Sequence, residues 1–198
     1  MKRIGIYSGT FDPVHNGHIG FAVRALDETD LDEVVFIPER TPRGKEHVTN
    51  LEHRFELIAR AVAPYNGLSV RLLPPEQFCV QGTLPELRQA FGSAKLSMML
   101  GSDVVKTFPE RWANLDELFA SMELVIGVRR GDDRKNLKKL LRSLDVHVKP
   151  CYTFVDSPLA EASSTRVRRG HAVRDVPPEV SVYIESHKLY GKGEARNA

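Results

Sequence analysis

The sequence predicts an α/β protein in which helices cover both faces of a doubly wound parallel sheet. Segments with the apolar pattern of strands alternate along the chain with segments whose apolar residues recur at helical spacing. The chain has 198 residues and is 41% hydrophobic, which is enough to bury one substantial core. A glycine-rich turn follows the first apolar run, as expected where a strand leads into a helix.

The predicted strands are short apolar runs separated by helical patterns or by turn residues. In chain order they are Arg3–Tyr7, Glu33–Ile37, Leu68–Leu72, Lys95–Leu100, Glu123–Val128, Val146–Val148 and Tyr152–Val155. Because helical crossovers join parallel strands, the carboxyl ends of these strands meet at one edge of the sheet, where ligands bind in open α/β folds.

The predicted helices each carry an apolar stripe at a spacing of three or four residues. The stripes are Ile19, Ala22, Val23 and Leu26; Leu51, Phe55, Ile58, Ala59 and Val62; and Leu137, Leu140, Leu141 and Leu144. Thr49 and Glu52 match a capping box at the start of the second helix. The basic residues of the helix predicted at 135–144 indicate either a solvated face or a contact with a partner. Pro178 is suited to the first turn of the last helix.

The composition argues against a nucleic-acid-binding, a disulfide-rich or a membrane-spanning protein. The formal net charge of +2 is too small to indicate nucleic-acid binding. Cys79 and Cys151 are too few for a disulfide framework, and no apolar run reaches the roughly 18 residues of a membrane span. We therefore expect a soluble cytoplasmic protein without a membrane partner. Residues 1–190 are expected to form a single domain and residues 191–198 a disordered tail.

The most informative segment is Gly9-Thr10-Phe11-Asp12-Pro13-Val14-His15-Asn16-Gly17-His18, directly after the first strand. Thr10 and the two histidines supply hydrogen-bond donors, and unpaired N–H groups at a helix start attract anions. This pattern favours a cradle for nucleotide phosphates. Two other interpretations are a purely structural turn and a metal site, for which Asp12 is the only carboxylate close in sequence.

Two further motifs follow later strands. Gly101-Ser102-Asp103 comes directly after the fourth predicted strand, where Asp103 can accept hydrogen bonds from a ribose or can cap a helix. Ser163-Ser164-Thr165-Arg166-Val167-Arg168 combines hydroxyls with a guanidinium, which suits either phosphate binding or helix capping.

These three motifs, in this order, resemble those of the nucleotidylyltransferase superfamily. The first motif is similar to that of the nicotinate mononucleotide adenylyltransferases in particular. The resemblance extends to about Tyr190 and implies a Rossmann-like fold of the nucleotidylyltransferase type. It also implies an enzyme of NAD biosynthesis that transfers the adenylyl group of ATP to nicotinate mononucleotide and releases pyrophosphate.

The resemblance implies roles for individual residues. The catalytic residues would be His15, His18 and Lys45. The ATP-binding residues would be Gly9, Thr10, Phe11, His15, His18, Gly101, Asp103, Ser164, Thr165 and Arg168. Mg²⁺ would enter on the triphosphate, so no dedicated metal site of the protein is expected.

Departures from the family pattern concentrate in the acceptor half of the site. Arg43 and Gly44 replace a proline and a histidine before Lys45, and Gly82 stands where the family has an aspartate, before Thr83. We expect Thr83 and Trp112 to contact the acceptor, with Trp112 either stacking on a pyridine ring or serving only as packing. Nicotinamide mononucleotide, phosphopantetheine, CTP as donor and a non-catalytic nucleotide-binding regulator remain alternatives. The sequence is also compatible with a homo-oligomer.

Overall fold

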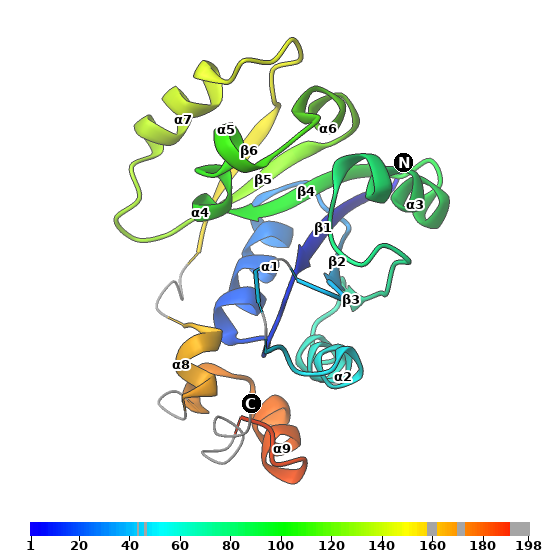
Figure 1. Ribbon diagram of the computed structural model, residues 1–198, viewed down its shortest axis with the longest axis vertical. Helices are drawn as coiled ribbons and strands as arrows, with labels where there is room; N and C mark the ends of the chain where they lie inside the picture. Colours follow the sequence, from blue (N-terminus) through cyan, green and yellow to red (C-terminus); the bar gives the residue numbers. More distant parts are fainter. Residues whose placement is uncertain (43, 46, 158–161, 170–172, 191–198) are drawn as a thin grey trace.

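The computed structural model describes residues 1–42, 44–45, 47–157, 162–169 and 173–190. Its centre is a parallel sheet in the order β3-β2-β1-β4-β5-β6 (Figure 1). The strands are β1 (Arg3–Gly9), β2 (Glu33–Pro38), β3 (Leu68–Val70), β4 (Lys95–Gly101), β5 (Glu123–Val128) and β6 (Tyr152–Asp156). The predicted fold class is confirmed, because every strand pair is parallel and the order reverses between β1 and β4.

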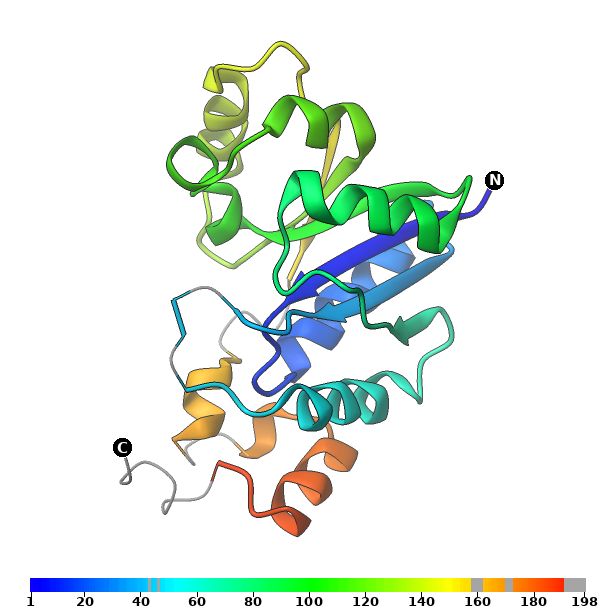
Figure 2. The ribbon, with the colours of Figure 1, turned by 45° about the vertical axis from the view of Figure 1, so that its right-hand side comes forward.

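Helices lie on both faces of the sheet, with α3 and α1 on opposite sides (Figure 2). They are α1 (Asn16–Glu28), α2 (Leu51–Val62), α3 (Val80–Phe91), α4 (Ser102–Val105), α5 (Phe108–Arg111), α6 (Leu115–Ser121), α7 (Arg134–Ser143), α8 (Ser164–Arg168) and α9 (Pro178–Ser186), with a 3-10 turn, η1 (Val173–Asp175). Within the described ranges, no helix is long and apolar enough to cross a bilayer.

Alternating strand residues build two cores, one on each face. Val35 and Ile37 of β2 pack in the layer that includes α3, α6 and α7, whereas Val34 and Phe36 pack with α1, α2 and α9. Successive side chains of a strand point to opposite faces, so both sets can be buried at once. Leu137 and Leu141 of α7 are buried as the sequence predicts.

Three local predictions are wrong. Residues 146–148 form no strand, because the N–H of Val146 bonds to the carbonyl of Leu144 and that of Val148 to the carboxylate of Asp116. The third strand ends at Val70 and excludes Leu72, which is 38% exposed. The capping box at Thr49 does not form.

The N-cap of α2 is Asn50, and no side chain caps that helix. The backbone of Thr49 is used instead to hold the loops under the pocket described below. Its N–H donates to Asp12 and its carbonyl accepts from Arg54. Tertiary contacts therefore replace the local cap that the sequence predicts.

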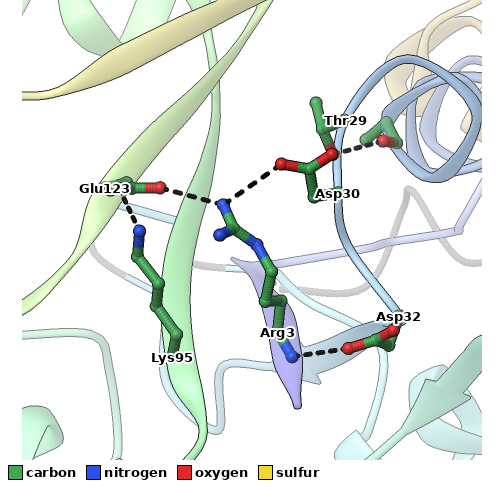
Figure 3. Close-up of polar contacts among 7 residues, drawn as sticks. Arg3, Thr29, Asp30, Asp32, Lys95 and Glu123 are labelled. Carbon is green, nitrogen blue, oxygen red and sulfur yellow. Dashed lines mark hydrogen bonds and ion pairs between the residues drawn. The ribbon is translucent and has the colours of Figure 1, made fainter. Parts of the chain in front are cut away.

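Polar contacts link the amino ends of three strands, at the edge opposite the ligand-binding edge (Figure 3). Arg3 on β1 lies 3.5 Å from Glu123 on β5, and Lys95 on β4 pairs with the same carboxylate. The backbone N–H of Arg3 donates to Asp32 at 2.7 Å. These contacts tie β1, β4, β5 and the turn before β2 together at this edge.

The prediction of one domain over residues 1–190 stays a prediction. The described residues up to Tyr190 share one sheet and its two covering layers. The tail predicted to be disordered, residues 191–198, lies outside the described residues, as does Arg43 of the loop before Lys45.

Candidate active site

A pocket of about 810 Å³ opens at the carboxyl ends of β1 and β4, where the strand order reverses. All but one of the predicted site residues line it. These residues are Gly9, Thr10, Phe11, His15, His18, Lys45, Gly101, Asp103, Trp112, Ser164, Thr165 and Arg168. The fold therefore brings together motifs that are separated by up to about 150 residues in sequence.

The signature turn places two imidazole rings against each other at the start of α1. The rings of His15 and His18 stack with centroids 3.6 Å apart and planes inclined by 23°. The backbone N–H of His15 donates to Nδ1 of His18 at 3.2 Å. Because Nδ1 accepts, the neutral His18 ring carries its proton on Nε2 and can donate from that atom.

Both histidines are held neutral. Burial, and then the positive charge of Arg129, lower the pKa of His15 to about 4. Burial also lowers the pKa of His18 well below its usual range, with further contributions from His15, Arg129 and Lys45. Nδ1 of His15 is buried and has no hydrogen-bond partner among the described residues. The turn therefore offers neutral imidazole nitrogens to a ligand.

Gly9 and Phe11 shape the floor of the turn. A Cβ on Gly9 would lie 3.2 Å from the Phe11 ring, so glycine lets that ring pack against the end of β1. Phe11 is only 3% exposed and makes an edge contact with the His18 ring at 5.0 Å between centroids. Its part in the pocket is mainly to support His18.

A buried arginine, which sequence reasoning missed, braces this turn from below. Arg54 is 1% exposed, and its guanidinium donates to the carbonyls of Thr10 at 2.8 Å, Thr49 at 2.7 Å and Arg40 at 3.1 Å. One side chain thus joins the signature turn to the loops before and after Lys45. The sequence carries no sign of this, because the three carbonyls become neighbours only in the folded chain.

The carboxylate of Asp12 is also engaged in structural contacts. Its Oδ1 accepts from the Tyr190 hydroxyl at 2.6 Å, and its Oδ2 accepts from the Thr49 N–H at 3.4 Å. No group of three or more metal-ligating side chains occurs among the residues that the structure describes. Nothing here brings a third ligand to the two histidines.

Cationic and hydroxyl groups surround the stacked histidines. Nζ of Lys45 donates to the Thr10 hydroxyl at 2.8 Å, and burial together with Arg168 lowers the pKa of this lysine. Arg168 donates to the backbone carbonyl of Asp12 and, at 3.1 Å, to the Thr165 hydroxyl. Ser164 donates to the carbonyl of Pro13 at 2.9 Å. The serine-threonine turn of α8 is therefore docked onto the signature turn.

Asp103 lies across the pocket and pairs with Arg129 at 3.1 Å. A Cβ at Gly101 would fall 2.4 Å from Oδ1 of Asp103, so this carboxylate can sit here only beside glycine. Arg129, which directly follows β5, is a pocket residue that sequence reasoning missed. Its position at the carboxyl end of a central strand was the available signal.

The loop after β5 is fixed by Asp132. This carboxylate accepts from the Ser102 hydroxyl, from Lys106 at 2.8 Å and from the N–H of Arg129 at 2.9 Å. Burial raises its pKa, but these hydrogen bonds outweigh burial and hold the pKa at about 2. Arg129 is therefore presented to the pocket by an anchored loop.

Thr83, which we expected to contact the acceptor, lies outside the pocket. This residue is 3% exposed, lies outside the pocket lining, and its hydroxyl accepts from the Cys79 N–H at 3.1 Å. The hydroxyl serves the start of α3, and the predicted contact of Thr83 with the acceptor stays a prediction. Val80 and Gln81 line this wall instead.

Trp112 also lines the pocket. Its ring packs against Phe108 and Phe78, with centroids 5.1 Å and 5.9 Å away, and its Nε1 donates to the Thr107 hydroxyl at 3.2 Å. The half-buried indole is thus held in a fixed orientation with part of its surface toward the pocket.

Comparisons with known proteins agree with this arrangement. The cytidylyltransferase-like family model matches residues 6–170. A probable nicotinate-nucleotide adenylyltransferase of Clostridium perfringens is 33% identical, over 96% of this chain and 98% of that protein, and the nicotinate-nucleotide adenylyltransferase of Bacillus subtilis is 32% identical, over 96% and 99%.

Solved structures give the same fold. The nicotinic acid mononucleotide adenylyltransferase of Plasmodium falciparum, complexed with NaAD, superposes with a TM-score of 0.74 at 19% identity, over 96% of this chain and 98% of that one. Its complex with APC gives a TM-score of 0.75 at 18% identity and the same coverage. The chain belongs to the cytidylyltransferase-like family and, within it, to the nicotinate-nucleotide adenylyltransferases.

Proposed function

We propose that this protein transfers the adenylyl group of ATP to nicotinate mononucleotide, giving nicotinate adenine dinucleotide and pyrophosphate. The observation that carries the proposal is the convergence of three motifs on one pocket at the reversal of strand order. His15 and His18, the Gly101–Asp103 turn and the Ser164–Arg168 helix all line it. Family membership supports the same reaction, because the relatives are named for it.

The triphosphate would lie between the signature turn and α8. An oxygen of the acceptor phosphate forms a bond to the α-phosphorus, the bond from that phosphorus to the bridging oxygen breaks, and pyrophosphate leaves with the electron pair. This displacement requires no proton from the protein, so catalysis consists of positioning and charge stabilisation. Neutral Nε2–H of His18 is suited to donate to the α-phosphate, where charge develops.

The remaining donors suit the departing pyrophosphate. Lys45, Thr165 and Arg168 all line the pocket, with the two cations near enough to affect each other, and they supply two positive charges and a hydroxyl. ATP would bind as its Mg²⁺ complex, in which the ion keeps most of its waters and is part of the substrate. Asp103, paired with Arg129, also lines the pocket, and its carboxylate can accept from a ribose hydroxyl.

The acceptor would occupy the space between Trp112 and the start of α3. Trp112 offers an aromatic surface on which a flat pyridine ring can stack. The first N–H groups of α3 have no partner within the helix, and Val80 and Gln81 face the pocket there. Neither Trp112 nor this wall carries a negative charge that would oppose an acidic ring substituent.

The test is release of pyrophosphate from ATP and Mg²⁺ with a panel of acceptors. Nicotinate mononucleotide should support turnover, and phosphopantetheine or replacement of ATP by CTP should not. Absence of pyrophosphate with both pyridine mononucleotides would refute the assignment and favour a non-catalytic nucleotide-binding role. Turnover of phosphopantetheine alone would assign a different acceptor.

We further infer that the protein works in the cytoplasm, since its two exposed cysteines are free thiols that suit a reducing compartment. A homo-oligomer remains a proposal, to be tested by light scattering of the purified protein. A mass near 22 kDa, the mass of one chain, would refute it.

A further inference from the structure

One cation of the pocket stands apart from the others. Lys45, Arg111, Arg129 and Arg168 all line the pocket. Lys45 donates to Thr10, Arg129 pairs with Asp103, and Arg168 is bound to the signature turn. Arg111 is exposed, and its guanidinium has no hydrogen bond or ion pair with any residue in the described part of the chain.

The position of Arg111 relates it to the acceptor. Arg111 is the last residue of α5 and Trp112 follows it directly, and the side chains of both residues line the pocket. Asp103 and Glu39, two carboxylates of the pocket lining, already have partners. Asp103 pairs with Arg129, and Glu39 accepts from the Phe78 N–H at 3.1 Å. A negative group entering this side of the pocket would therefore find Arg111 free.

The two pyridine mononucleotides differ in the charge that they present there. Both carry a cationic pyridinium ring, but nicotinate adds a carboxylate, whereas nicotinamide adds a neutral amide. Backbone N–H groups, such as those at the start of α3, can donate to a carboxylate oxygen or to an amide oxygen alike. A full positive charge attracts the carboxylate and repels the uncompensated cationic ring of the amide.

We propose that Arg111 is the residue that selects the acid form of the acceptor: it pairs with the carboxylate of a pyridine ring stacked on Trp112. This inference rests on the proposed function and adds the determinant of its specificity. The planar guanidinium fork can take both carboxylate oxygens at once. Its exposure limits the effect, since water and salt screen the pair.

The test compares kcat/KM for nicotinate mononucleotide and nicotinamide mononucleotide in the parent, R111Q and R111K, at saturating ATP. R111Q keeps a polar side chain but removes the charge, and should lower the acid-to-amide ratio about tenfold, through the KM of the acceptor. R111K should retain an intermediate ratio. The KM for ATP should not change. R142Q, which alters an exposed arginine of α7 outside the pocket lining, is the matched control and should keep the parental ratio.

A second measurement needs no variant. Raising the ionic strength from about 0.05 to 0.5 M should lower the parental acid-to-amide ratio, because screening weakens an exposed charge pair. The phosphate common to both acceptors cancels in this ratio. A ratio that R111Q leaves at the parental value would overturn the role of Arg111, whatever the response to salt, and would leave adenylyl transfer intact. Absence of turnover of either mononucleotide by the parent would instead refute the proposed function.

Discussion

Acidification should destabilise the protein through the two stacked histidines of the signature turn. The pKa of His15 is about 4 in the folded protein and near 6.5 in an unfolded chain. The pKa of His18 is lowered as well. Below pH 6.5 the unfolded chain therefore binds more protons than the folded protein, so stability falls as the pH falls. The loss begins near pH 6.5 and is complete for His15 below pH 4.

The size of the effect follows from the pKa of His15. A difference of about 2.5 pH units, at about 1.4 kcal/mol for each, gives a loss of about 3.5 kcal/mol from this residue alone. Near pH 5.5 His15 contributes a slope of about 1.2 kcal/mol per pH unit, and His18, whose pKa is also lowered, adds to the slope in the same direction. Acidic side chains titrate mostly below pH 5, so the window from pH 6 to 5 isolates the histidines.

Urea unfolding at pH 7.0, 6.0, 5.5 and 5.0 measures this slope. The variant His15→Asn should show a slope that is lower by at least about 1.2 kcal/mol per pH unit, because it removes one titrating ring and also relieves the repulsion on His18. His147→Asn, which alters an exposed loop histidine, is the matched control and should follow the parent. Equal slopes in the parent and in His15→Asn would refute the buried, neutral state that we assign to this ring.

Three further predictions concern the phosphate side of the pocket. His18→Ala should lower kcat by roughly 100-fold, about 2.7 kcal/mol, with an unchanged circular dichroism spectrum, and a folded variant with parental kcat would exclude a catalytic role. Arg168→Ala should raise the KM for ATP at least about tenfold, and Arg168→Lys should restore it only in part, because one ammonium cannot keep both contacts of the fork. Parental ATP kinetics in Arg168→Ala would place this arginine outside the site. Gly101→Ala should raise the KM for ATP about tenfold, because the new Cβ displaces the flexible carboxylate of Asp103. The loss of stability should be small, because the backbone φ of −71° suits alanine. An unchanged KM for ATP would speak against contact between Asp103 and the nucleotide.

Much of the fold could be predicted because its signals are local. Strands β1, β2, β4, β5 and β6 coincide with apolar runs, and their boundaries differ from the predicted ones by at most two residues. The apolar run at 146–148 has the same pattern as these strands, but its backbone N–H groups bond to Leu144 and Asp116 and not to a neighbouring strand. Leu72 continues the apolar run of the third strand but lies beyond the end of β3. Apolar pattern indicates that a segment can be a strand, whereas pairing decides whether it is one.

In the candidate site, too, the features carried by local motifs could be predicted from the sequence. The convergence of His15, His18, Asp103 and Arg168 on one pocket could be predicted, because each stands in a motif at the end of a strand or the start of a helix, and parallel strands bring such ends to one edge. The family could also be predicted from the sequence, because the order of the motifs along the chain can be read without knowing any distance in the structure.

The contacts and protonation states of these residues follow from three-dimensional packing and could not be predicted. Arg54 joins three loops through carbonyls that are distant in sequence, and Arg129 acts on two histidines more than 110 positions away. Thr83 turned inward to serve its own helix. The pKa of His15 is lowered by burial and by the nearby charge of Arg129, so this shift exists only once the chain has folded. Burial and charge proximity are properties of three-dimensional packing, and a linear pattern of residues does not contain them.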